Sequence, residues 1–268
     1  MFGSYNESSK ARRILYTFAP FISIFLFILL WFWTHAGNPN LVASPIEVIE
    51  RAIALCQRPI SGHYLWGHVL ASIRRILLGL GLAVVVGVPL GILIGWNPYF
   101  AKTVGTLFEL IRPIPALAWI PLFVMWLGIG ETPKVILVFI GSLMPITVNS
   151  YTGVRLVSPL YLDVGRMFNC AKSRKLLINV VVPAALPAIF AGIRGSTSVA
   201  WMVVLAAEMM GADSGLGFLI NRGMNVFDIA LIMTGMVMIG VLGALLSLLL
   251  GAIERRVCPW NTSLKTSD

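Results

Sequence analysis

Long apolar runs alternate with short charged segments along this chain. Six runs contain no Asp, Glu, Lys or Arg, and they cover residues 14–33, 76–101, 113–130, 135–154, 176–193 and 229–253. A membrane-spanning helix needs about 20 predominantly apolar residues, and a charged residue at its end can reach the headgroups. The pattern predicts an all-α membrane protein with about six transmembrane helices, at roughly 15–34, 69–96, 104–129, 134–151, 186–207 and 229–252.

The composition agrees with this pattern, because hydrophobic residues make up 58% of the chain and charged residues only 12%. A typical soluble domain has about 25% charged residues. The first apolar run, Ile14–Trp33, follows a basic cluster, as the apolar part of a signal peptide does. It is longer than the usual length of about 7–15 residues, and no small-x-small cleavage site follows it. We therefore expect an uncleaved first span.

The basic residues are distributed unevenly between the two sides of the membrane. With six spans and both termini inside, the inner segments hold twelve of the twenty Lys and Arg residues, and the outer segments hold four. Cytoplasmic loops carry an excess of Lys and Arg. Both termini and the central loop at 155–180 are therefore predicted to be cytoplasmic. The net charge of +9 is explained by this topology, so no nucleic-acid partner is expected.

A short helix is predicted after the first span. Ser44 can cap it, Pro45 suits its first turn, and Glu47 completes a capping box. The segment is too short to cross the membrane, so we expect it to lie on the outer surface, where it packs at the interface or binds a partner. Four apolar residues are expected on one of its faces: Ile46, Ile49, Ile53 and Leu55.

Two spans carry small residues at four-residue spacing, which places each set along one helix face. Small side chains let helix backbones approach closely, so both stripes predict tight packing. The stripes are Gly79, Ala83, Gly87, Gly91 and Gly95 in one span and Ala184, Ala188, Gly192, Ser196 and Ala200 in the other. The third span differs, because Pro113, Pro115 and Pro121 each remove an amide donor. Irregular backbone is tolerated in a membrane only inside protein or along a wet cavity. This span is either a kinked helix or part of a transport pathway.

No motif for metal, disulfide or nucleotide chemistry occurs in the chain. Cys56, Cys170 and Cys258 lack CxxC spacing, and the three histidines form no HExxH pattern. The glycine-rich segment Gly211–Gly217 has no GK[ST] sequence after it, so we expect a turn rather than a phosphate site. The dipeptide Gly-Lys never occurs, so any ATP must be bound by another chain.

The segment from Tyr161 to Pro187 is a charged, helix-forming loop between two apolar spans, which indicates a docking site. It resembles the cytoplasmic "EAA" loop of the permease subunits of bacterial ATP-binding-cassette importers, with the pattern Glu-Ala-Ala-x3-Gly-x9-Ile-x-Leu-Pro. Other segments resemble the taurine, alkanesulfonate, nitrate and bicarbonate branch of that family: 41–45, 111–121, 126–132, 184–187, and Ala206-Ala-Glu208 with Gly215-Leu-Gly217. The likeness covers about residues 40 to 260.

The loop departs from the family pattern at its acidic and glycine positions. Without gaps, Pro183 takes the family Pro, Val164 takes the Glu and Cys170 takes the Gly. A one-residue insertion would instead put Asp163 on the Glu and Asn169 on the Gly, and asparagine tolerates a positive φ better than most residues. Both alignments stay open. The expected ATPase-coupling residues are Asp163, Val164, Gly165, Arg166, Asn169, Cys170, Ala171, Lys172 and Pro183.

The resemblance implies a type I, MetI-like permease bundle in a bacterial inner membrane. It implies an N-terminal part at 1–60, a permease domain at 61–257 and a cytoplasmic tail at 258–268. Two permease subunits, as a homodimer or pseudo-symmetric pair, would form the pathway. Two cytoplasmic ATPases, which bind ATP and Mg, would grip their loops, and a periplasmic or lipid-anchored binding protein would deliver the solute. This chain itself would bind membrane lipid but no cofactor.

Ionisable residues inside spans are costly, so they tend to face a bundle or water. The candidate pathway residues are Arg112, Pro113, Pro115, Trp119, Arg194, Ser198 and Glu208. Arg194 could favour an anionic solute such as a sulfonate or nitrate. It lies fourteen residues from Glu208 in one predicted helix, about 21 Å by helical rise, so those two cannot pair within that helix. A partner in another subunit or a lipid headgroup is the alternative role for Arg194.

The sequence therefore favours a transport subunit of an ATP-driven importer rather than an enzyme. Two other classes remain as alternatives. A self-sufficient secondary transporter would show inverted repeats between its halves. An intramembrane enzyme would need catalytic groups clustered at one membrane depth, and the few His, Asp and Glu residues here are dispersed.

Overall fold

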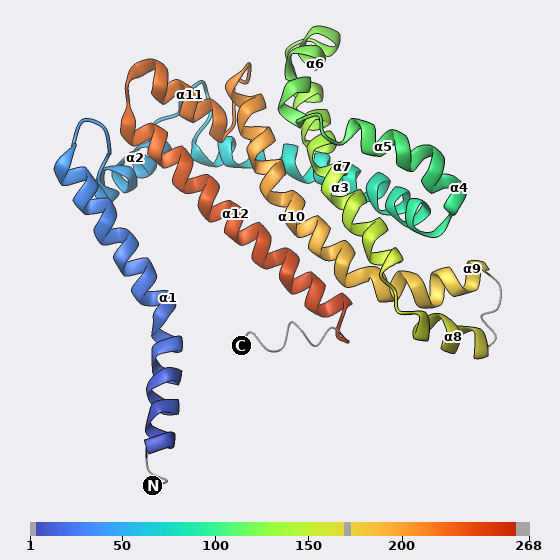
Figure 1. Ribbon diagram of the computed structural model, residues 1–268. Helices are drawn as coiled ribbons and strands as arrows, with labels where there is room; N and C mark the ends of the chain where they lie inside the picture. Colours follow the sequence, from blue (N-terminus) through green and yellow to red (C-terminus); the bar gives the residue numbers. More distant parts are fainter. Residues whose placement is uncertain (1–3, 169–172, 261–268) are drawn as a thin grey trace.

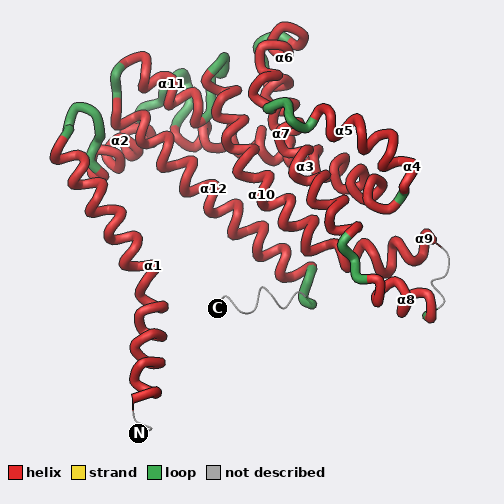
Figure 2. Tube along the Cα trace, viewed as in Figure 1, coloured by secondary structure: helices red, strands yellow, loops and turns green. Residues whose placement is uncertain are grey.

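The computed structural model describes residues 4–168 and 173–260, with side chains from Phe18 onward except those of Pro20 and Ser173. Helices follow one another through both segments (Figure 1), and Figure 2 shows no strand in these residues. In chain order they are α1 Ser4–Gly37, α2 Pro45–Gln57, α3 Leu65–Trp96, α4 Pro98–Phe100, η1 Ala101–Gly105, α5 Thr106–Ile111, η2 Ala116–Trp119, α6 Ile120–Leu127, α7 Glu131–Arg155, α8 Pro159–Met167, α9 Ser173–Leu176, η3 Leu177–Val181, α10 Val182–Met209, α11 Leu216–Val226 and α12 Ile229–Val257.

Four long apolar segments can each cross a membrane: α3, α7, the continuous stretch Arg174–Met209, and α12. The bent pair Pro98–Ile111 and Ala116–Leu127 and the apolar part of α1, Phe21–Gly37, are the other two apolar segments. The predicted all-α membrane fold with about six spanning segments is confirmed in outline.

Helices α3, α7 and α10 form the packed centre of the bundle, and small residues bring their backbones together. A Cβ atom added to Gly91 of α3 would lie 2.5 Å from Cβ of Ser150 and 2.6 Å from the carbonyl oxygen of Thr147, both on α7. One added to Gly192 of α10 would lie 2.6 Å from Cβ of Asn149. The close helix packing expected from the two small-residue stripes is therefore confirmed.

The bundle has two distinct ends (Figure 1). Helices α2 and α11 lie at one end, called here the α11 end, and α8 and α9 lie at the opposite end, called the α8 end. Helix α1 meets the rest of the chain near α2, where the Trp31 indole donates to the Ala43 carbonyl at 2.9 Å, and then diverges from the bundle. Its side chains between Phe21 and Leu30 are mostly exposed and apolar, as expected of a surface that faces lipid or another helix.

The third predicted span is not one helix, and this corrects the range 104–129. Its first arm, Pro98–Ile111, and its second arm, Ala116–Leu127, meet at 81°. Pro113 and Pro115 lie between the arms, and a proline removes the amide that would continue the helical hydrogen bonds. Gly128, with φ of 75°, ends the second arm in a conformation that favours glycine.

The capping box at the start of α2 is confirmed. The Ser44 amide donates to Glu47 Oε2 at 2.7 Å, and the Glu47 amide donates to Ser44 Oγ at 3.2 Å. The expected apolar face was partly wrong, because Ile46, Ile49 and Ile53 are exposed whereas Leu55 is buried in the core. Leu55 follows Ile53 by two residues, which is about 200° around a helix and so the opposite face.

Substitution of the α3 glycines tests this packing. Gly91→Ala should lower the free energy of unfolding by about 1–3 kcal/mol, because the added methyl group meets α7 backbone that cannot yield locally. Gly81→Ala is the matched control, since a Cβ there has nothing within 4 Å. The control should be neutral or stabilise by up to about 1 kcal/mol. Midpoints of thermal unfolding in detergent measure both effects, and equal midpoints would contradict the packing described.

Candidate functional site

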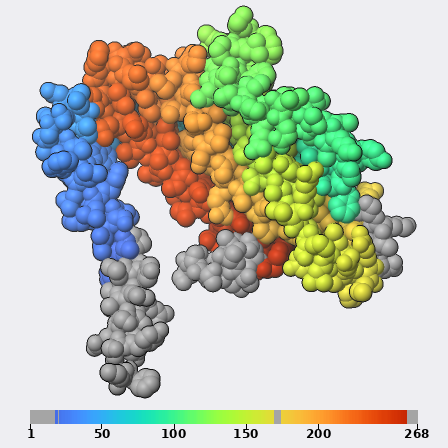
Figure 3. All heavy atoms as spheres, in the orientation of Figure 1, coloured from blue at the N-terminus to red at the C-terminus, as the bar shows by residue number. Residues whose placement is uncertain are grey.

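Helix α8 lies at the surface at one end of the bundle (Figure 3) and carries an exposed apolar stripe. Its opposite side is buried: a Cβ added to Gly165 would lie 2.8 Å from Leu176 Cδ1 and 2.9 Å from Val180 Cγ2. The absence of a side chain at Gly165 therefore lets α8 pack closely against the start of the next span. The stripe consists of large side chains that are 42% to 85% exposed: Leu160, Tyr161, Val164, Met167 and Phe168. A contiguous exposed apolar patch of this kind marks an interaction surface.

The charged residues of this loop contribute little to holding it in place. Arg166 Nη1 donates to Asp163 Oδ1 at 3.0 Å, and both side chains are more than 60% exposed. An exposed pair of this kind contributes at most about 1 kcal/mol. Pro183 lies half-buried in the first turn of α10, after the π-helix η3. The predicted coupling residues Asn169, Cys170, Ala171 and Lys172 lie outside the described residues.

A hollow of about 420 Å³ lies between the bent pair, α7 and α10, and is called here the bend pocket. Two candidate pathway residues, Arg112 and Pro115, line it. The Arg112 side chain is 46% exposed, and its one hydrogen bond within the described residues is to Glu109 at 3.5 Å, so most of its donors remain available. Asn149 of α7 also lines the pocket, and its amide donates to the Pro145 carbonyl at 2.8 Å. Sequence reasoning missed Asn149, although an amide side chain inside an apolar run was a usable signal.

The other candidate pathway residues do not line this pocket. Pro113 is exposed at the bend, and Trp119 packs on Phe123 with ring centroids 6.0 Å apart. Ser198 is exposed on α10. Arg194 forms an ion pair with the buried Glu254 of α12. This corrects the expectation of a partner in another subunit or a headgroup: α12 returns beside α10, so a carboxylate sixty residues along the chain reaches Arg194.

At the α11 end, a buried arginine joins three helices and a loop. Arg75 of α3 is 1% exposed, and its Nε and Nη2 donate to the two carboxylate oxygens of Glu131 at 2.8 and 2.6 Å. Its Nη1 donates to Glu208 Oε1 at 2.7 Å and to the Ser214 carbonyl at 2.8 Å, and Nη2 also reaches Ser214 Oγ at 3.2 Å. Five hydrogen bonds match the five N–H donors of a guanidinium. Arg75 is therefore fully satisfied, and the Arg75–Glu208 pair is buried on both sides.

The glycine-rich loop is held by His68, Ser72 and Glu208. With Arg75 and Glu131, these side chains are called here the polar cluster. Three successive amides donate to it: Gly215 to His68 Nδ1 at 3.1 Å, Leu216 to Ser72 Oγ at 2.9 Å, and Gly217 to Glu208 Oε2 at 2.9 Å. Ser72 Oγ in turn donates to Glu208. The segment is thus a turn, as expected. A side chain would not fit at Gly215, because its φ is 123° and its backbone lies against the Glu208 carboxylate.

Glu208 therefore has a structural role within one chain, and this does not support its place among the pathway residues. Sequence reasoning named Glu208 but missed Arg75, Glu131 and Ser72 as its neighbours. The available signals were an arginine at the edge of an apolar run and an acidic residue on each of two other helices. Nothing in their spacing shows that they meet.

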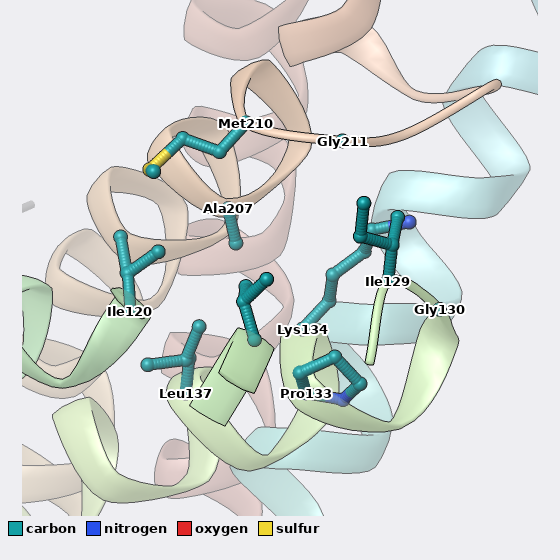
Figure 4. A pocket seen from close by; sticks show the side chains of 10 residues that line it. Ile120, Ile129, Gly130, Pro133, Lys134, Leu137, Ala207, Met210 and Gly211 are labelled. Atoms are coloured by element: carbon teal, nitrogen blue, oxygen red, sulfur yellow. The ribbon is translucent and has the colours of Figure 1, made fainter. Parts of the chain in front are cut away.

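Figure 4 shows a small hollow beside this cluster, formed by Ile120, Leu137, Ala207 and Met210 among others. Its volume is about 20 Å³, enough for roughly one water molecule. Lys134 extends past it, and its Nζ reaches Glu131 Oε1 at 3.3 Å. The hollow is too small for an organic solute, so the bend pocket is the better candidate for a pathway.

Residues 87–261 match the family described as binding-protein-dependent transport system inner membrane component. The taurine transport system permease protein of Escherichia coli is 32% identical over 96% of this chain and 97% of its own. The nitrate import permease protein of Synechocystis is 31% identical over 90% and 89%, and a putative aliphatic sulfonates transport permease protein of Bacillus subtilis is 30% identical over 88% and 87%. A chain of the MetNI methionine ABC transporter, solved in inward-facing conformations, superposes with a TM-score of 0.62 at 19% identity, over 78% of this chain and 98% of that one.

The chain belongs to the family of binding-protein-dependent transport system inner membrane components. It is a multi-pass membrane protein and a transport subunit. The resemblance noted in its sequence, to the taurine, sulfonate and nitrate branch, is confirmed by these relatives.

Removal of Glu208 tests the polar cluster. Glu208→Ala leaves the Arg75 guanidinium, Ser72 and the Gly217 amide without their acceptor, and breaking a buried ion pair typically costs about 3–5 kcal/mol. The midpoint of thermal unfolding in detergent should fall by several degrees. Asp213→Ala is the control, since Asp213 is exposed in the same loop and makes no ion pair within the described residues. A Glu208 variant as stable as the control would rule out this role.

Proposed function

We propose that this chain is the permease subunit of an ATP-driven importer for a small anionic solute, and that α8 is the element on which a partner ATPase acts. The observation that carries this proposal is the apolar stripe of α8. It lies at one end of a membrane bundle, and within the described residues nothing covers it. Membership of a binding-protein-dependent transport family supplies the context.

An amphipathic helix with an exposed apolar face is suited to a groove on a partner protein. The sequence has no Gly-Lys dipeptide and hence no Walker A loop, so ATP and Mg belong to that partner. Basic side chains near α8, including Arg155, Arg174 and Lys175, are exposed and available to meet acidic groups beside the groove.

Movement of α8 is transmitted to the bundle through short connections. Helix α7 ends at Arg155 and α8 begins at Pro159, whereas α9, η3 and α10 run on from one another without a break. A force on α8 therefore acts on both α7 and α10, which border the bend pocket. Closure of two ATPases on ATP would move two such helices, one in each permease subunit, and convert an inward-open pathway to an outward-open one.

The distribution of basic residues supports one orientation of the chain in the membrane. Arg155, Arg174, Lys175, Arg255 and Arg256 all lie near the α8 end, and an excess of basic residues favours the cytoplasmic side. The α8 end and both termini are then cytoplasmic in a bacterial inner membrane. The α11 end, with α2 and α11, faces outward, where a binding protein delivers the solute.

The bend pocket is the part of the pathway that one subunit contributes. A second permease subunit, identical or pseudo-symmetric, completes it. Arg112 supplies positive charge there, which suits the acids for which the relatives are named, namely taurine, nitrate and aliphatic sulfonates. Pro113 and Pro115 shape the pocket by breaking the span, and Asn149 adds a hydrogen-bonding side chain.

Acidic substitutions on α8 test the docking role. Val164→Asp combined with Met167→Asp places two charges in the apolar stripe, so association with the ATPase should be lost in a pull-down while membrane insertion persists. Deletion of residues 163–175 should have the same effect. Met224→Asp is the control, because Met224 is similarly exposed but lies on α11 at the other end. Retained ATPase association in both α8 variants would refute this part of the proposal.

Arg112→Gln tests the pathway. It should lower ATP-driven uptake of a sulfonate or nitrate into proteoliposomes roughly tenfold, because a hydrogen bond to a charged group contributes about 1.5–3 kcal/mol. ATPase association should stay unchanged. Arg58→Gln, an exposed arginine near the α11 end that lies outside the pocket, should transport normally. Equal uptake by the two variants would place the solute elsewhere.

A further inference from the structure

A second polar hollow lies on the outer part of α3, well away from the bend pocket. Its volume is about 330 Å³, and Gly67 and Ala71, one helical turn apart, are among its lining residues. Arg74 and Arg75 line it one turn further along, and Glu131 and Ser214 line it from α7 and the glycine-rich loop. His63 also lines the hollow and lies against Gly67, where a Cβ would come within 3.2 Å of its Nδ1. The small side chain of Ala71 lies between this part of the hollow and the two arginines.

Among the Arg and Glu side chains that line this hollow, Arg75 and Glu131 are paired, whereas Arg74 has no such partner within the described residues. It is exposed, and within the described residues it makes neither a salt bridge nor a hydrogen bond. The uncharged run of α3 begins directly after Arg75, so Arg74 lies at the boundary of the apolar region. A charge at that position is unfavourable unless an anion or water compensates for it.

Glu131, the acidic residue that lines this hollow, does not compensate for the charge of Arg74. Both carboxylate oxygens of Glu131 accept from Arg75, at 2.8 and 2.6 Å, and one also accepts from Lys134 at 3.3 Å. Its charge is therefore already matched by two cations. No oxygen of Glu131 lies within 4 Å of the Arg74 guanidinium, since no salt bridge joins them. The positive charge of Arg74 therefore has no counter-charge within the described residues.

Ser214 of the glycine-rich loop adds a donor to the lining of the hollow. Its Oγ accepts from Arg75 Nη2 at 3.2 Å, and its carbonyl accepts from Arg75 Nη1 at 2.8 Å. The hydroxyl hydrogen has no acceptor within the described residues, so it is free to donate. A free guanidinium and a free hydroxyl beside small residues are the donors that a phosphate or sulfonate group accepts from.

We propose that this hollow is an oxyanion-binding site in which Arg74 and Ser214 hold a phosphate or sulfonate group. The group belongs either to a lipid headgroup, at the outward-facing surface of the membrane that holds this chain, or to a free solute. The site goes beyond the proposed function, because it requires neither ATP nor transport. It is separate from the bend pocket. Arg75 and Glu131 of the polar cluster also line it, but Arg74 makes no hydrogen bond or salt bridge to that cluster.

Two binding measurements distinguish the two sources. In the first, the full-length chain, with the subunits that co-purify with it, is mixed with phosphatidylglycerol, and bound lipid is counted by native mass spectrometry. In the second, the same complex is placed in nanodiscs of digalactosyldiacylglycerol, which has no phosphate, and titrated with methanesulfonate by calorimetry. Arg74→Gln should weaken binding in at least one measurement by about tenfold or more, the loss expected for a charge-assisted hydrogen bond.

Arg74→Lys should retain part of the affinity, because the charge remains without the fork of donors. Arg222→Gln is the control: it removes an exposed charge of α11 that does not line the hollow and should bind as the unmodified chain does. Since Arg74 makes no salt bridge or hydrogen bond within the described residues, Arg74→Gln should unfold at the unchanged temperature. An Arg74-dependent loss for lipid identifies a headgroup site, and one for methanesulfonate identifies a solute site. Binding that is absent from both measurements, or equal in Arg74→Gln and Arg222→Gln, overturns the proposal.

Discussion

The buried guanidinium of Arg75 is the interaction on which the α11 end of the bundle depends. It ties α3 to the first turn of α7 through Glu131 and to the last turn of α10 through Glu208. A buried charge is tolerable only when it is paired and hydrogen-bonded, and here each N–H donor has an acceptor. The same three helices are pressed together further along by small residues such as Gly91 and Gly192. The centre of the molecule is therefore closely packed, and the exposed stripe of α8 and the bend pocket lie at its edges.

The proposed function depends on features at those edges. Helix α8 stands at one end with its apolar stripe uncovered, and the bent pair stands at the side with a pocket beneath it. Gly165 lets α8 pack on the bundle and still expose its apolar stripe. Because Gly165 has no side chain, one face of α8 packs against Leu176 and Val180 while the other stays exposed. In both alignments of the coupling loop Gly165 falls on an alanine of the family pattern, so a small residue is needed there for packing. Under the proposed docking role of α8, a closely packed core would transmit force from α8 to the bend pocket.

The sequence predicted what depends on local pattern. Apolar runs located the spans, four-residue spacing predicted the close packing at Gly79 and Gly91, and the order Ser44-Pro45-Ile46-Glu47 predicted a capped helix. It could not predict contacts between distant segments: Arg75 meets Glu131 and Glu208 across 56 and 133 residues, and Arg194 meets Glu254 across sixty. The three prolines indicated a disturbed helix at 113–121, but the 81° turn depends on tertiary packing, in which the first arm contacts α3 and the second arm contacts α7. The prediction that Leu55 shares a face with Ile53 was wrong for a simpler reason. Residues two apart in a helix lie about 200° apart around its axis.

The claim that α8 is where a partner ATPase meets this chain is tested most directly by site-specific crosslinking. A photo-reactive amino acid at position 167, on the apolar stripe of α8, is compared with one at position 253, which is exposed on α12 near the same end of the bundle. Irradiation of the assembled transporter should join position 167 to the ATPase with high yield and position 253 with little or none. Crosslinks from position 253 without crosslinks from position 167 would show that the ATPase binds elsewhere and would contradict the role assigned to α8.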